Sequence, residues 1–146
     1  MQHTTNLIKT MPYITKQFKF CAAHKYWNNS WPPDKNYEVF GDDIKVHGHN
    51  YILDITVTGP IDQDSGFVFD IQKLKKIVDT HVVSVIDHSQ IQEDIKWFEG
   101  KQPSTENLVL FIWESVSKHI DSPAKLYKIK LRETPTIFTE YFGPEN

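Results

Sequence analysis

Residues 46–57 read Val-His-Gly-His-Asn-Tyr-Ile-Leu-Asp-Ile-Thr-Val, and this stretch decides the fold. Apolar and polar side chains alternate along it, which is typical of a half-buried β-strand. One face carries His47 and His49, followed by an apolar residue at every second position. The other face is polar, with Asn50 and Asp54. The stretch therefore predicts a strand that turns two histidines toward an apolar interior.

Two histidines on one face of a strand suit a metal ion. Cα atoms two residues apart lie roughly 6.6 Å from each other at about 3.3 Å of rise per residue, which lets both imidazoles bind one ion. Gly48, between His47 and His49, leaves room for an approach to the backbone. The alternative is that one or both are ordinary, partly buried histidines. We favour the metal site.

A third histidine is available upstream. Residues 14–24 also alternate, and His24 shares the face of Phe18, Phe20 and Ala22. The chain has a single cysteine, so a site with several thiolates is excluded. Three histidines with an open fourth position form the catalytic zinc pattern. Cys21 has the opposite parity to His24, so we expect it to face away from the metal as a small buried hydrophobe.

Composition indicates one ordinary globular domain. The chain has 146 residues, of which 39% are hydrophobic and 24% charged, with a formal net charge of −3. This charge gives no reason to expect a nucleic-acid partner. No leader pattern or long apolar run is present, so we expect neither a secretory signal nor a membrane span, and the single cysteine suits the cytoplasm. We expect a flexible N-terminus over 1–12 and one domain over 13–146.

The remaining patterns predict two helices between two strand pairs. Asp70 and Ser104 are helix caps, and each precedes apolar residues at helical spacing. The expected strands cover 14–24, 44–58, 126–133 and 137–142, and the expected helices run from 71 to about 86 and from 104 to 120; segments 28–36 and 89–102 are expected to be loops. The order ββααββ predicts an α+β fold with an antiparallel four-stranded sheet.

Five short motifs in this order resemble the family of 6-pyruvoyl-tetrahydropterin and 6-carboxy-tetrahydropterin synthases. They are FCAAH at 20–24, HGHNY at 47–51, DH at 87–88, PSTEN at 103–107 and ETP at 133–135. The resemblance spans about residues 14–142. It implies the tunnelling fold (T-fold), Zn²⁺ on His24, His47 and His49, and a substrate derived from 7,8-dihydroneopterin triphosphate. It also implies a homo-oligomer, trimer or hexamer, with sites at subunit interfaces.

The resemblance implies further roles. Glu133 would hold the pterin ring, since a carboxylate can accept two N–H bonds from the amino-pyrimidinone edge; the alternative is an ion pair with a Lys or Arg. Asp87 and His88 would form an acid/base pair; the alternative is a histidine favoured by a helix C-terminus. Thr105 and Glu106 would lie near the pterin, although their roles as helix-start residues are an adequate explanation by themselves.

The sequence departs from the family at one position. Tetrahydropterin-forming members carry a cysteine shortly before the His-Gly-His, but this chain has Asp43 there. An aspartate acting as a base near neutral pH would need burial. The resemblance implies a zinc-dependent pterin lyase. The alternatives are side-chain cleavage to 6-hydroxymethyl-dihydropterin with Asp43 replacing the cysteine, or a non-catalytic relative that binds zinc and pterin.

Overall fold

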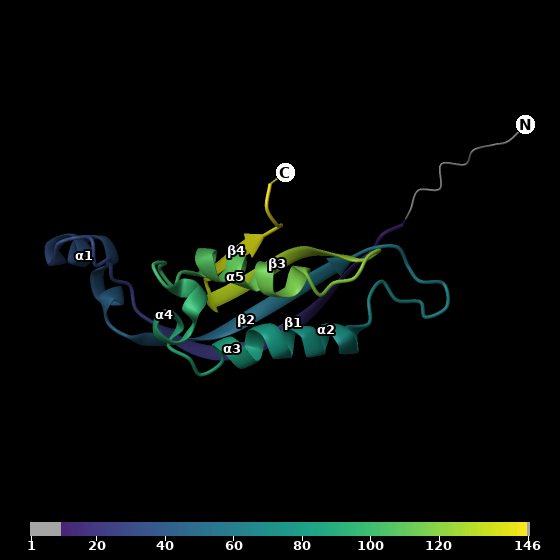
Figure 1. The fold of residues 1–146 in the computed structure, drawn as a ribbon, viewed down its shortest axis with the longest axis horizontal. Helices are drawn as coiled ribbons and strands as arrows, with labels where there is room; N and C mark the ends of the chain where they lie inside the picture. Colours follow the sequence, from purple (N-terminus) through teal and green to yellow (C-terminus); the bar gives the residue numbers. More distant parts are fainter. Residues whose placement is uncertain (1–9, 146) are drawn as a thin grey trace, which may run out of the picture.

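Four antiparallel strands form one sheet in the spatial order β1-β2-β3-β4 (Figure 1). The computed structural model describes residues 10–145, so most of the segment expected to be flexible lies outside the described residues. The strands are β1 (Tyr13–His24), β2 (His47–Thr58), β3 (Lys125–Thr134) and β4 (Ile137–Tyr141). The predicted α+β class and the antiparallel four-stranded sheet are confirmed.

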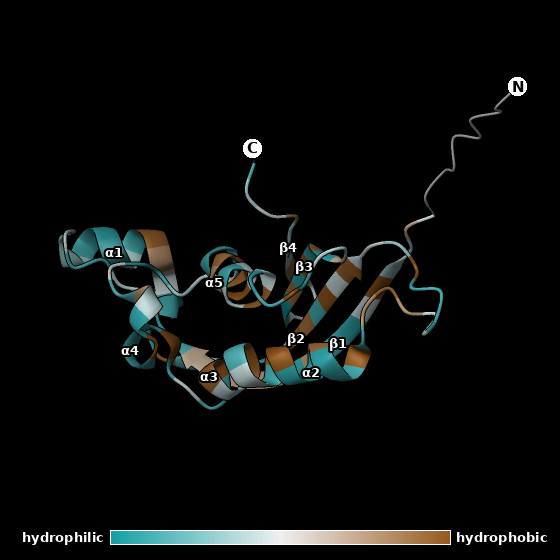
Figure 2. Ribbon diagram, turned by 45° about the vertical axis from the view of Figure 1, so that its right-hand side comes forward, coloured by the Kyte–Doolittle hydropathy of each residue, from teal (hydrophilic) through white to brown (hydrophobic). Residues whose placement is uncertain are grey.

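One face of the sheet packs against α2 (Ile71–Val78) and α5 (Thr105–Ser117). Figure 2 shows the alternation of hydrophilic and hydrophobic residues along β1 and β2 that produces this one-sided core. The fully buried side chains include Leu53, Ile55, Leu74, Leu108, Ile112, Ile129 and Leu131. Each such side chain stabilises the fold by about 1.5–3 kcal/mol relative to an exposed one.

Both predicted helix caps are present. The Asp70 carboxylate accepts a hydrogen bond from the Gln72 backbone N–H at 2.9 Å, and the Ser104 hydroxyl accepts one from the Asn107 N–H at 3.2 Å. These contacts satisfy backbone donors that have no partner in the first helical turn. Among the described residues, no helix is long and apolar enough to cross a membrane.

The helix expected from residue 71 to about 86 is not uniform. A π-helical turn, η2 (Asp79–Val83), separates α2 from the short α3 (Ser84–Ile86). Val78 and Val82 are both fully buried. Residues four apart share one face of an α-helix, and both stay on the core side across the wider π turn.

The expected loop over 28–36 contains the start of a helix. The segment α1 (Pro33–Phe40) continues into the 3₁₀ turn η1 (Gly41–Ile44), so β2 begins at His47 rather than near residue 44. A proline at the first helical position followed by an acidic residue favours this start. Asn36 is fully buried, and its side chain bonds to the backbone N–H and carbonyl of Asn28 at 2.7 and 3.0 Å. Figure 1 shows α1 at one end of the molecule.

The segment 89–102 also contains short helices. They are α4 (Ile91–Asp94) and the 3₁₀ turn η3 (Lys96–Phe98). Ile91, Ile95 and Phe98 are buried and join the core. Three buried residues within a polar stretch do not form a clear helical period, and the sequence pattern therefore predicted a loop.

Candidate metal centre

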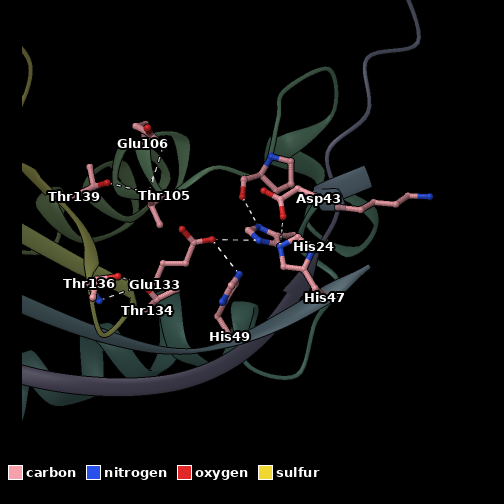
Figure 3. A network of polar contacts seen from close by, with 12 residues as sticks. His24, Asp43, His47, His49, Thr105, Glu106, Glu133, Thr134, Thr136 and Thr139 are labelled. Atoms are coloured by element: carbon pink, nitrogen blue, oxygen red, sulfur yellow. Dashed lines mark hydrogen bonds and ion pairs between the residues drawn. The ribbon is translucent and has the colours of Figure 1, made fainter. Parts of the chain in front are cut away.

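The three predicted metal ligands meet where β1 ends and β2 begins. In the antiparallel register His24 pairs with His47, and Ala22 pairs with His49. Because all three histidines have inward parity, their imidazoles converge on the same side of the sheet (Figure 3). One ring nitrogen from each lies within 4.8 Å of the other two.

Backbone carbonyls fix the orientation of two rings. Nδ1 of His24 lies 2.7 Å from the Pro103 carbonyl oxygen, and Nδ1 of His47 lies 2.8 Å from that of Lys45. A carbonyl only accepts, so Nδ1 carries the hydrogen and Nε2 presents a lone pair in the neutral ring. Such outer contacts are typical of metal-binding histidines.

Nε2 of His24 and Nε2 of His49 are buried, and neither makes a well-oriented hydrogen bond among the described residues. The Glu133 carboxylate approaches both. Lone pairs of neutral imidazoles that face a carboxylate favour a cation between them, and a metal ion would satisfy both nitrogens at once. Burial also lowers the pKa of His49, which favours the neutral form that binds metals. The residues present therefore fit a zinc ion with three histidine ligands.

Glu133 points into the centre from the end of β3. The pairing of β3 with β4 shifts register between Arg132 and Thr134, which leaves Glu133 at an irregularity that re-aims its side chain. Its Oε1 lies 3.3 Å from Nε2 of His24 and 3.1 Å from Nε2 of His49 (Figure 3). Contact with His24 holds the pKa of Glu133 below its usual value despite burial. Among the described residues, Glu133 forms no ion pair with a Lys or Arg, which was the alternative explanation for its position.

Asp43 lies on the other side of the centre, in η1. Its Oδ1 is 3.8 Å from Nε2 of His47, and its side chain is 61% exposed. In the single chain the Asp43 carboxylate therefore lacks the burial that an aspartate base near neutral pH would need. The carbonyl of Asp43 accepts a hydrogen bond from the Tyr26 backbone N–H at 2.9 Å, which fixes the turn beside the metal centre.

A pocket of about 390 Å³ opens beside the histidines. Asp43, His47, His49 and Glu133 line it together with two aromatic residues, Tyr26 and Phe40. Neither aromatic residue was predicted from the sequence. Tyr26 stands two residues beyond His24, so the parity of β1 was the signal that could have placed it on the inward side.

Thr105 and Glu106 stand at the start of α5, near Glu133 (Figure 3). Thr105 is buried, and its hydroxyl lies 2.9 Å from that of Thr139 on β4 and 3.2 Å from Oε2 of Glu106. These contacts tie the helix start to the sheet. Their part in the first helical turn agrees with the structure, whereas their placement beside a pterin stays a prediction.

Asp87 and His88 do not reach the pocket beside the metal centre in one chain. Nδ1 of His88 lies 2.9 Å from the Asp87 carboxylate, so the predicted pair forms, but the His88 side chain is 82% exposed. The Cys21 N–H donates to Asp87 at 2.9 Å, which lowers the pKa of that carboxyl. His88 and Cys21 line a different pocket.

Cys21 corrects one expectation. It faces away from the metal centre as predicted, but it is exposed rather than buried. Its thiol donates to Oδ1 of Asn50 at 2.8 Å on the polar face of the sheet. No helix covers that face at Cys21, and this is why a strand residue of apolar character stays accessible.

These observations define a T-fold chain with a three-histidine centre of the kind that holds a catalytic metal. The family model for 6-pyruvoyl tetrahydropterin synthase matches residues 13–144. The chain belongs to this family. It is 35% identical over 134 residues to the 6-pyruvoyl tetrahydrobiopterin synthase of Drosophila melanogaster, which covers 90% of this chain and 80% of that protein.

Two further relatives bear on the fold and the chemistry. The solved 6-pyruvoyl tetrahydropterin synthase of Caenorhabditis elegans is 29% identical and superposes with a TM-score of 0.87, covering 92% of this chain and 97% of that one. The dihydroneopterin monophosphate aldolase of Pyrococcus furiosus is 36% identical over 120 residues, covering 82% of this chain and 88% of that protein.

Proposed function

We propose that this protein is a zinc-dependent pterin lyase that acts on 7,8-dihydroneopterin triphosphate or a close relative. The observation that carries the proposal is the convergence of His24, His47 and His49 beside Glu133, in a chain of this family. Bound zinc would lower the pKa of the substrate hydroxyls that contact it and polarise a developing carbonyl.

Side chains of the protein would bind the pterin ring and accept the substrate proton. With His24 and His49 engaged by the metal, Glu133 is free to accept two N–H hydrogen bonds from the amino-pyrimidinone edge. Thr105 and Glu106, at the start of α5, would border the ring. Asp43, beside His47, would accept the proton that leaves the substrate side chain.

A second candidate reaction is cleavage of the side chain to 6-hydroxymethyl-dihydropterin. The carboxylate of Asp43, in place of the cysteine, favours it. The similarity to the aldolase of Pyrococcus furiosus supports it as well. A carboxylate is also catalytic in one solved relative of the same fold, since variants of the Plasmodium vivax enzyme replace a catalytic glutamate by alanine or cysteine.

Product analysis distinguishes the candidates. Incubating the zinc-loaded protein with 7,8-dihydroneopterin triphosphate is expected to give a tetrahydropterin and free triphosphate, measured by mass spectrometry. Side-chain cleavage would instead give 6-hydroxymethyl-dihydropterin and a two-carbon aldehyde that keeps the triphosphate. Recovery of unchanged substrate by a protein that binds it would contradict both reactions and support the non-catalytic alternative.

We also propose a homo-oligomer, a trimer or hexamer, with the site near an interface. A four-stranded sheet leaves strand edges that invite pairing with another chain. Along β4, Ile137 and Phe138 are large apolar residues that are 51% and 46% exposed. His88 does not line the pocket of Glu133, although His49 borders both pockets, so a neighbouring chain would bring a second acid/base pair to the metal centre.

Light scattering at micromolar concentration tests the assembly. The expected mass is three or six times the 17.1 kDa of one chain. A mass of 17.1 kDa under these conditions would contradict the proposal.

A further inference from the structure

Tyr26 combines three features that the proposed function has not used. Its ring lines the pocket that also contains Asp43 and Glu133. Its hydroxyl has no hydrogen-bond partner among residues 10–145. Thr134, a second hydroxyl residue in this pocket, is already engaged with Thr136, whose N–H it accepts at 3.3 Å and whose hydroxyl lies 3.5 Å away. Tyr26 is therefore a side-chain donor that remains available to a ligand.

The phenol is held rigidly. Its ring stacks on Phe40 with centroids 5.5 Å apart and planes 20° apart, and Phe40 stacks in turn on Trp31 at 5.6 Å and 20°. The ring centroid also lies 5.1 Å from that of the His24 ring. A donor fixed by packing against neighbouring rings needs little reorganisation when a ligand binds.

The phenol of a tyrosine is neutral at physiological pH and carries one O–H donor. Carboxylates only accept hydrogen bonds, so they favour substrate hydroxyls over carbonyls, whereas a neutral phenol can donate to a carbonyl oxygen.

We propose that Tyr26 is a catalytic hydrogen-bond donor that recognises a carbonyl oxygen on the side chain of the bound pterin. The inference rests on the proposed function, because that reaction converts a side-chain hydroxyl into a carbonyl. The donor would thus bind the developing carbonyl more strongly than the starting hydroxyl. Stronger binding of the transition state than of the substrate accelerates the reaction.

Two pterins that differ at one side-chain carbon test the selectivity. Sepiapterin carries a carbonyl next to the ring, and 7,8-dihydrobiopterin carries a hydroxyl there. In titration calorimetry of the zinc-loaded protein, Tyr26→Phe is expected to weaken sepiapterin binding about five- to tenfold, the worth of one hydrogen bond. Binding of 7,8-dihydrobiopterin is expected to change by less than about twofold, a shift too small for a lost hydrogen bond. Turnover is expected to fall by about the same five- to tenfold, with KM nearly unchanged.

Tyr37→Phe is the matched control, since Tyr37 lies on α1 and is 53% exposed. It should leave both affinities unchanged. Equal weakening of both pterins by Tyr26→Phe, or no weakening, would overturn the inference, as would a loss of zinc from that variant. A wild-type protein that bound neither pterin would overturn the proposed function and this inference together, whereas unselective binding by the variant would overturn the inference alone.

Discussion

Replacing His47 and His49 together by alanine is expected to reduce the zinc content from one ion per chain to nearly none. The three Nε2 atoms lie within 4.8 Å of one another, and the Nδ1 contacts to backbone carbonyls hold His24 and His47 in the metal-binding orientation. Loss of an orienting contact alone typically costs 10- to 100-fold in metal affinity, about 1.4–2.7 kcal/mol, and loss of two ligands costs more. Elemental analysis of the purified protein measures the effect.

A second pair of histidines provides the control. The rings of His81 and His119 stack 4.0 Å apart, away from the metal centre. Replacing both by alanine should leave the zinc content at one ion per chain. Full zinc retention after the loss of His47 and His49, in a variant with an unchanged circular dichroism spectrum, would rule out this metal site.

Replacing Asp43 by asparagine is expected to reduce turnover by about 10²–10⁴-fold, the usual contribution of a general base. The amide is nearly isosteric with the carboxylate but cannot accept a proton at neutral pH. Because Asp43 lies 3.8 Å from His47 and is not counted among the metal ligands, zinc content and pterin affinity should persist. Steady-state kinetics and elemental analysis on the same preparation separate these effects.

Two further variants, Asp42→Asn and Asp43→Cys, make this test more specific. Asp42 stands beside Asp43 in the same 3₁₀ turn, so Asp42→Asn should leave turnover unchanged. If Asp43 merely occupies the place of a thiolate, Asp43→Cys should increase tetrahydropterin formation. A protein whose turnover is indifferent to Asp43→Asn must use another base, and His88, paired with Asp87, is the first candidate.

Several features follow from local sequence alone. Alternation places side chains on one face or the other, so the inward positions of His24, His47 and His49 could be predicted from parity. The caps at Asp70 and Ser104 could be predicted because a capping side chain bonds to a backbone N–H two or three residues away. The ββααββ order follows from the same local periods. Each of these depends on residues that are neighbours in the chain.

The remaining features depend on contacts between distant segments. Glu133 meets His24 and His49 because β3 lies beside β2 and its pairing with β4 is irregular at that point. Tyr26 joins the pocket because η1 folds back onto the end of β1.

His88, paired with Asp87, instead opens onto the pocket of Cys21, which does not include Glu133. Parity determines on which face a residue lies, but it carries no information about which strand end, bulge or helix start comes to rest beside it. The inward histidines were therefore predictable from the sequence, whereas the groups that surround them were decided by the tertiary packing of β3, η1 and α5.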